Sequence, residues 1–112
     1  MKLITAIVQP GKLSDVQIAL AQHQVAGLTI SECTGYARQR GHNEVYRGAE
    51  FAIDFVLKVK VEVLAADEAA DAVIDVIVAA ARSGQVGDGK VWVVPVEKAV
   101  RIRTGEQDAA AV

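Results

Sequence analysis

The chain has 112 residues, a length that suits one domain. Its formal net charge is −2, so a general attraction for nucleic acid or for anionic membranes is not expected. Apolar residues make up 52% of the sequence and aromatic residues only 4%, so aliphatic side chains must build the core. Cys33 is the only cysteine, which excludes an internal disulfide and favours the reducing cytoplasm. Residues 1–12 do not fit a signal peptide, and no apolar run is long enough to cross a bilayer.

The first third of the chain predicts a strand, a helix and a second strand. β-Branched residues over 1–9 indicate the first strand, which a Pro-Gly pair ends. Apolar residues at helical spacing indicate a helix over 14–25, with Ser14 or Asp15 as its N-cap. The run LTISECTGY at 28–36 indicates the second strand.

The third expected strand, 55–64, has the clearest alternation in the chain. One of its faces carries Phe55, Leu57, Val59, Val61 and Val63. The other carries Val56, Lys58, Lys60, Glu62 and Leu64. Because strand side chains alternate between the two faces of a sheet, we expect the first set, from Leu57 onward, to meet the helices.

The last third predicts a helix and a final strand. Acidic residues begin a helix over 67–83, with Asp67 as its N-cap. A strand follows over 90–96, where Pro95 favours a sheet edge or a strand end. The helix is expected to bury an apolar stripe of Ala70, Val73, Ile74, Ile77, Val78 and Ala81.

The order of these elements predicts an α+β fold of the ferredoxin-like βαββαβ type, in one domain over 1–112. Right-handed crossovers place both helices on one sheet face, so the face with Lys60 and Glu62 stays open, and we favour a second subunit as its cover. The stretch RQRGHNEVYRGAEF at 38–51 joins the second and third strands. Loops of this length are usually functional or disordered.

Two stretches offer groups that bind anions. SGQVGDGKV fits G-x-x-x-x-G-K from Gly84 to Lys90, but Val91 supplies no hydroxyl for magnesium and the helix–loop–strand order is the reverse of a Walker A motif. An anion cradle of backbone N–H groups and one lysine remains, with an ordinary glycine-rich turn as the alternative. Arg101 and Arg103 project to one side of an extended segment and suit phosphate oxygens, with a solvated edge as the alternative.

The long loop offers further polar groups. Gln39 provides a neutral carbonyl oxygen of the kind that magnesium accepts, and a disordered surface loop is the alternative. His23 and His42 lack partners at metal-ligand spacing, and Cys33 lies within an expected strand. No Ser-His-Asp set or carboxylate pair stands out, so we expect a binding protein rather than an enzyme.

Three motifs of this sequence resemble those of a single protein family. YRGAEF at 46–51 resembles the signature Tyr-Arg-Gly-Ala-Glu-Tyr, and SGQVGDGKVWVVPVEKAVRIRTGE at 83–106 resembles a second signature of the same family. GYARQRGH at 35–42 matches the entry to the family's long loop. The chain thus resembles, over its whole length, the PII family of nitrogen-regulatory signal proteins.

This resemblance implies a cytoplasmic homotrimer of ferredoxin-like subunits with three functional segments. They are the flexible T-loop at 37–54, the B-loop at 83–90, and a C-terminal loop and tail at 101–112. ATP and ADP would compete for clefts between subunits. The matching nucleotide positions are Thr29, Gly35, Arg38, Glu62, Leu64, Gly87, Asp88, Gly89 and Lys90, with Arg101 and Arg103 contributed by a neighbouring subunit.

The resemblance also implies an effector and protein targets. With ATP and magnesium in place, 2-oxoglutarate would bind at Gln39, Lys58 and Gly87, and Gln39 would hold the magnesium ion. The T-loop would relay the ligand state to targets such as an ammonium transporter or metabolic enzymes, without insertion into the membrane. The matching partner contacts are Tyr46, Arg47 and Phe51.

Phe51 departs from the family pattern, since it replaces a tyrosine that some relatives carry as a nucleotidylation site. A phenyl ring has no nucleophilic hydroxyl, so we expect no covalent modification at this position. Two alternatives remain open. One is a specialised paralogue that senses another small anion or adenine nucleotide, and the other is a slow ATPase.

Overall fold

The computed structural model describes residues 1–38, 44–46, 49–51 and 53–112. Three short 3₁₀ turns accompany the regular elements, at Pro10–Lys12, Asp67–Ala69 and Asp108–Ala111. The helices are α1 (Leu13–Gln22) and α2 (Ala70–Ala81). The strands are β1 (Lys2–Val8), β2 (Thr29–Arg38), β3 (Glu44–Tyr46), β4 (Ala49–Phe51), β5 (Ile53–Ala65) and β6 (Gly89–Pro95).

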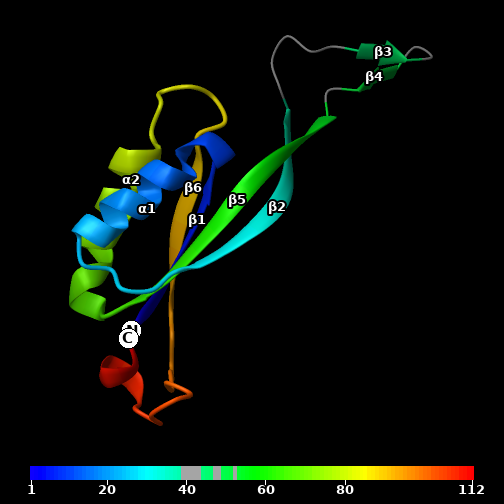
Figure 1. The fold of residues 1–112 in the computed structure, drawn as a ribbon. Coiled ribbons are helices and arrows are strands. Elements are labelled where there is room, and N and C mark those ends of the chain that lie inside the picture. The colour runs from blue at the N-terminus through cyan, green and yellow to red at the C-terminus, as the bar shows by residue number, and fades with distance from the viewer. Residues whose placement is uncertain (39–43, 47–48, 52) are drawn as a thin grey trace.

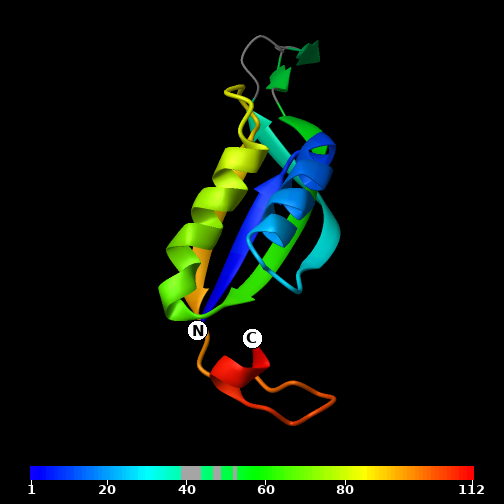
Figure 2. The same ribbon diagram turned by 60° about the vertical axis from the view of Figure 1, so that its left-hand side comes forward.

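The main sheet has the strand order β2-β5-β1-β6, and each neighbouring pair is antiparallel. Both helices pack on one face of this sheet (Figures 1 and 2), as right-handed crossovers require. The predicted ferredoxin-like α+β fold is therefore confirmed. The prediction for Pro95 is also confirmed, since this residue ends β6 at one edge of the sheet. The trimer stays a prediction.

The core lies between the two helices and the sheet face that they cover. Ala70, Val73, Ile77 and Ala81 are buried, as the stripe on α2 predicts. Ile74 and Val78 of the same predicted stripe are only partly buried. The complete buried apolar set is Ile4, Ala6, Val8, Val16, Leu20, Val59, Val61, Val63, Ala65, Ala70, Val73, Ile77 and Ala81.

The prediction for β5 is correct for three residues and wrong for one. Val59, Val61 and Val63 are buried under the helices, but Leu57 is 68% exposed. The strand has 13 residues and α1 only 10. At about 3.3 Å per strand residue and 1.5 Å per helical residue, β5 runs well past the helices that cover its other half. Leu57 lies on the correct face but beyond the helix layer.

Both predicted N-caps are wrong. Neither Ser14 nor Asp15 caps α1, which begins at Leu13 without a side-chain cap. Asp67 does not cap α2 either, because it begins a 3₁₀ turn and accepts a hydrogen bond of 2.7 Å from the terminal ammonium of Met1. In both places a 3₁₀ turn already satisfies N–H groups, as in the 2.9 Å bond from the Lys12 N–H to the Gln9 carbonyl oxygen.

Two other boundaries differ from the sequence-based expectation. The helix expected to reach residue 25 ends at Gln22, because Gln24 has a φ of 64° that no α-helix contains. The stretch expected as a loop contains a short antiparallel pair, in which Glu44 lies opposite Phe51 and Tyr46 opposite Ala49. Among the described residues, no helix is long and apolar enough to cross a membrane.

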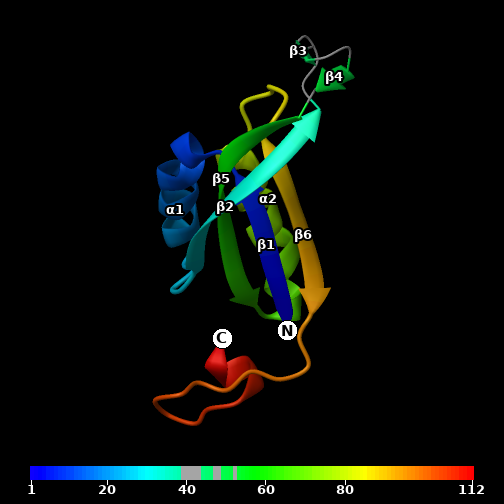
Figure 3. The ribbon, with the colours of Figure 1, turned by 90° about the vertical axis from the view of Figure 1, so that its right-hand side faces the viewer.

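The helices leave the opposite face of the sheet open (Figure 3), and the residues on that face are mixed in polarity. Lys58, Lys60 and Glu62 lie on it, as the alternation of β5 predicts. Trp92 of β6 and Leu64 of β5 share this face and are about half exposed. This surface carries both apolar area and charge outside the core.

Ile77 provides a test of the core. Its side chain has no exposed surface, so Ile77→Ala should lower the free energy of unfolding by about 2–5 kcal/mol. Urea unfolding followed by circular dichroism measures the change. Ile18→Ala, at a residue of α1 that is 57% exposed, is the control and should change stability by no more than about 0.5 kcal/mol. Equal losses for the two variants would contradict this assignment of the core.

Candidate functional site

The glycine-rich loop between α2 and β6 has a defined backbone. Gly84, Gly87 and Gly89 have φ values of 85°, 98° and 105°, a region that other residues rarely adopt. At Gly89 an added Cβ would lie 1.7 Å from the carbonyl oxygen of Ile7. Glycine at position 89 is therefore required twice, by its conformation and by the close approach of β1.

The carboxylate of Asp88 organises the first half of this loop. It accepts hydrogen bonds from the backbone N–H groups of Ser83 and Gly84, each at 2.9 Å, and a short one from the Ser83 hydroxyl. The Ser83 hydroxyl in turn accepts a bond of 3.2 Å from the Gln85 N–H. The hydrogen bond from the Ser83 hydroxyl, followed by those from the backbone, holds the pKa of Asp88 below its ordinary value.

The carbonyl oxygen of Gly87 fixes the second half of the loop. It accepts a hydrogen bond of 3.2 Å from Nε2 of Gln9 and one of 2.5 Å from Nζ of Lys58. Lys58 was predicted as a ligand residue, and the structure brings it to the predicted Gly87. The sequence did not predict Gln9, since one polar residue after a strand carries no pattern.

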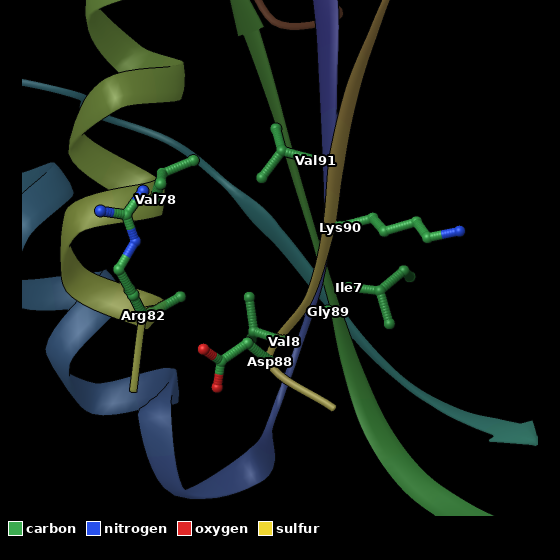
Figure 4. Close-up of a pocket in the computed structure, with 9 residues that line it drawn as sticks. Ile7, Val8, Val78, Arg82, Asp88, Gly89, Lys90 and Val91 are labelled. Atoms are coloured by element: carbon green, nitrogen blue, oxygen red, sulfur yellow. The ribbon is translucent and has the colours of Figure 1, made fainter. Parts of the chain in front are cut away.

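The two faces of the sheet separate the groups around the loop (Figure 4). Lys90 and Ile7 point to the open face, whereas Val8 and Val91 point to the helix side. A cavity of about 180 Å³ lies between the end of α2 and strands β1 and β6. Its lining consists of Ile7, Val8, Val78, Ala81, Arg82, Asp88, Gly89, Lys90 and Val91.

Some donors of the loop lack protein acceptors. Among the described residues, the backbone N–H groups of Val86, Gly87 and Asp88 donate to none. Val86 and Gly87 are exposed, and Asp88 is partly exposed. Lys90 follows two residues after Asp88 and projects from the open face. The loop thus offers backbone donors and a lysine ammonium to an external anion.

The predicted adenine positions lie farther down the open face. Thr29 of β2 lies opposite Glu62 of β5, and Leu64 follows on the same face. The Glu62 carboxylate also accepts a hydrogen bond of 3.4 Å from the Thr5 hydroxyl. Four residues separate Glu62 from Lys58, which corresponds to about 13 Å along a strand.

Gly35 lies beside the lysine of this strand. A Cβ at Gly35 would be 3.8 Å from Cγ of Lys58, so the small residue leaves space along the lysine stem. The structure therefore brings Gly35, Lys58 and Gly87 together at one end of the open face. Arg38 is the last residue of β2 at the same end of the strand.

Arg101 and Arg103 follow the end of β6 that lies opposite the glycine-rich loop. After β6 the tail leaves the sheet and turns below it, away from the glycine-rich loop (Figures 1 and 3). Arg101 pairs with Glu106 at 3.2 Å, and the Gly105 N–H donates to the Arg101 carbonyl oxygen at 2.7 Å. Within one chain the structure does not bring Arg101 or Arg103 to Lys90.

The remaining predicted site residues belong to the long connection between β2 and β5. Gln39 and Arg47 lie outside the described residues. Tyr46 lies in β3 and Phe51 in β4, the two strands of the short antiparallel pair. Their predicted roles are not tested by the fold.

The fold and the loop together define a ferredoxin-like α+β subunit with a candidate anion-binding cradle. Comparison with known proteins gives its family. A family model described as "Nitrogen regulatory protein P-II" matches residues 1–106. The chain belongs to this family, and the resemblance inferred from its motifs is confirmed.

Curated relatives match the chain from end to end. Nitrogen regulatory protein P-II of Klebsiella oxytoca and nitrogen regulatory protein P-II 1 of Escherichia coli strain K12 are each 48% identical over 112 residues, which is 100% of both chains. Nitrogen regulatory protein P-II of Microchaete diplosiphon is 49% identical over the same length.

The hydrogen bonds of Asp88 lead to a prediction about pH. A carboxyl whose pKa is lowered by folding stabilises the folded loop above its unfolded pKa, and this contribution is lost as the pH falls through the folded value. We expect the Asp88 carboxyl to titrate below an ordinary aspartate, as measured by NMR of its side-chain carbon. Ser83→Ala should move the pKa back toward the ordinary value, because the Ser83 hydroxyl is the largest cause.

Asp67 is the control for this titration, because its pKa is lowered by the hydrogen bond from the terminal ammonium of Met1 and not by Ser83. The lowered pKa of Asp67 should be the same in the wild-type protein and in Ser83→Ala. If the pKa of Asp88 were the same in Ser83→Ala as in the wild-type protein, the hydrogen bond from the Ser83 hydroxyl would not be its cause.

Proposed function

We propose that this chain is a ligand-sensing regulatory protein of nitrogen metabolism, which binds ATP and ADP in competition between the subunits of a cytoplasmic homotrimer. Membership of the P-II family supports the regulatory role. The observation that carries the choice of ligand is the set of N–H groups at Val86, Gly87 and Asp88, which have no acceptor among the described residues and precede Lys90 closely in the chain. Such a combination of backbone donors and an ammonium group suits phosphate oxygens.

The charges around the loop favour an anion. Lys58 and Lys90 both lie on the open face, and Lys58 donates to the Gly87 carbonyl oxygen. The Asp88 carboxylate within the loop already accepts hydrogen bonds from Ser83 and Gly84. The loop therefore presents mainly positive charge and N–H donors to a polyphosphate, whose adenine would extend toward Thr29 and Glu62.

A complete nucleotide site in this proposal needs a second copy of the chain. Arg101 and Arg103 lie at the opposite end of the sheet from Lys90, so one chain alone cannot apply all three to one ligand. Half-exposed apolar residues on the open face, such as Trp92, provide area for an interface. A closed ring of three copies would repeat the same composite site at each interface.

The proposal extends to magnesium and 2-oxoglutarate. The Lys58 ammonium has three N–H donors, and only one is needed for the Gly87 carbonyl oxygen. The others can bind a carboxylate of the oxoacid. Gln39 would supply a neutral oxygen to magnesium, which neutralises phosphate charge when it is bound.

The relay to target proteins would run through β2 and β5. These strands carry Gly35 and Lys58 and remain paired up to Arg38 and Ile53, where the T-loop continues. Ligands that make different contacts in different loop conformers shift the loop population. The T-loop would then contact an ammonium transporter or a metabolic enzyme through Tyr46, Arg47 and Phe51. In this role the chain acts as a binding protein and not as an enzyme.

A mixed-trimer experiment tests the composite nucleotide site. Lys90→Ala and Arg103→Ala should each weaken ATP binding roughly tenfold or more, because each removes one charged phosphate contact. When the two variants are co-refolded in equal amounts, roughly a quarter of the interfaces combine the intact Lys90 of one chain with the intact Arg103 of the next. Calorimetry should then detect a fraction of sites with wild-type affinity.

Arg82→Ala is the matched control, because Arg82 lies on the helix side of the sheet and should leave ATP affinity unchanged. A mixture that binds no better than its two components would contradict a site shared between subunits. Light scattering that finds a monomer at micromolar concentration would contradict the homotrimer itself.

The effector site has a separate test. Gln39→Ala should weaken 2-oxoglutarate binding more than ATP binding, since the nucleotide keeps its own phosphate contacts. Calorimetric titrations of 2-oxoglutarate into the protein with ATP bound, with and without magnesium, measure how oxoacid binding depends on Gln39 and on the metal ion. Gln17→Ala on the exposed side of α1 is the control. Equal losses of both ligands, or tight oxoacid binding without magnesium, would argue against this arrangement.

A further inference from the structure

The carbonyl oxygen of Gly87 is held by two side chains that come from distant parts of the chain. Gln9 follows β1 and lies 78 residues away, and Lys58 in β5 lies 29 residues away. A carbonyl oxygen has two acceptor positions, so these two donors can fill both. We name this arrangement, Gln9 and Lys58 on the Gly87 carbonyl oxygen, the carbonyl clamp.

The clamp acts on the part of the loop for which the described residues provide no other hydrogen bond. The first half is organised by Asp88 through Ser83 and Gly84, and Gly89 is fixed against Ile7. Between these two anchors Val86 is almost fully exposed. Gly87 has a φ of 98° and no side chain, so its peptide group can rotate at low cost unless its carbonyl oxygen is held.

The orientation of this peptide controls what the cradle offers. No peptide bond in the described chain is cis, and in a trans peptide the C=O and N–H groups point in opposite directions. Holding the Gly87 oxygen against Gln9 and Lys58 therefore keeps the Asp88 N–H on the opposite side. A rotated peptide would turn an oxygen, instead of a donor, toward an anion in the loop, and the two would repel each other.

We propose that Gln9 is a positioning residue of the anion cradle, which fixes the Gly87–Asp88 peptide and is its main holder when Lys58 divides its N–H donors between the Gly87 oxygen and a carboxylate ligand. This inference rests on the proposed binding of nucleotide by the loop. Lys58 is charged and suits an incoming anion, whereas the Gln9 amide is neutral and has no such competitor. Gln9 thus keeps the Gly87–Asp88 peptide oriented while Lys58 binds the carboxylate of the effector.

The test compares Gln9→Leu with the wild-type protein, first without ligand. Leucine has a similar size but donates no hydrogen bond. We expect the Asp88 amide and the Gly87 carbonyl resonances to shift in NMR spectra, and Gln9→Arg, which restores a donor, to return them toward the wild-type positions. Gln17→Leu on α1 is the matched control and should shift neither. Resonances that stay in place in Gln9→Leu would overturn the proposal.

The second arm measures ATP affinity in the full-length protein by calorimetry. Loss of one neutral hydrogen bond should weaken ATP binding by roughly two- to tenfold, and the loss should grow when 2-oxoglutarate is present. Unchanged ATP affinity in Gln9→Leu, with a wild type that does bind ATP, would also overturn the positioning role. A wild type that binds no ATP would instead refute the proposed function, and the ligand-free resonances would still decide whether Gln9 orients the peptide.

Discussion

The close contact between Gly89 and the Ile7 carbonyl oxygen determines where the last strand can begin. Since a Cβ at this position would overlap the oxygen, only glycine lets β6 start directly against β1. From this point the strand pairs with β1 residue by residue, with Gly89 opposite Val8 and Lys90 opposite Ile7. The contact therefore sets which face Lys90 reaches and how the preceding loop lies over the end of the sheet.

Hydrogen bonds from near and distant parts of the chain order the loop that precedes this contact. Asp88 binds the backbone at its start, and Gln9 and Lys58 bind the carbonyl oxygen near its end. A glycine-rich sequence alone would give a flexible turn, since glycine loses more conformational freedom on folding than other residues. Here long-range hydrogen bonds remove that freedom, and the backbone donors of the loop are ordered before any ligand arrives.

Alternation and glycine spacing predicted most of the fold, because both report on local backbone geometry. Alternation assigned the faces of β5 and glycine spacing the turn before Lys90, while Pro95 indicated the edge position of β6. These patterns could not predict that Leu57 is exposed, since alternation gives the face of a side chain but not the length of the helix that covers it. The failed caps have a similar cause: the 3₁₀ turns before α1 and α2 satisfy N–H groups that a capping side chain would otherwise bind. Gln9 was missed because its role depends on a contact 78 residues away.

The pairing of β2 with β5 beyond the helix layer has a mechanical consequence. From Lys58 to Ile53 the two strands form a ribbon that only their own ladder supports, about 17 Å long at the usual rise per residue. In such a ribbon, a small rotation at the base would produce a larger displacement at the far end. A rotation of about 10° at its base, where Lys58 contacts the glycine-rich loop, displaces its far end by about 3 Å over this length. A rearrangement of one side chain at the base would thereby be enlarged into a movement on the scale of a protein–protein contact.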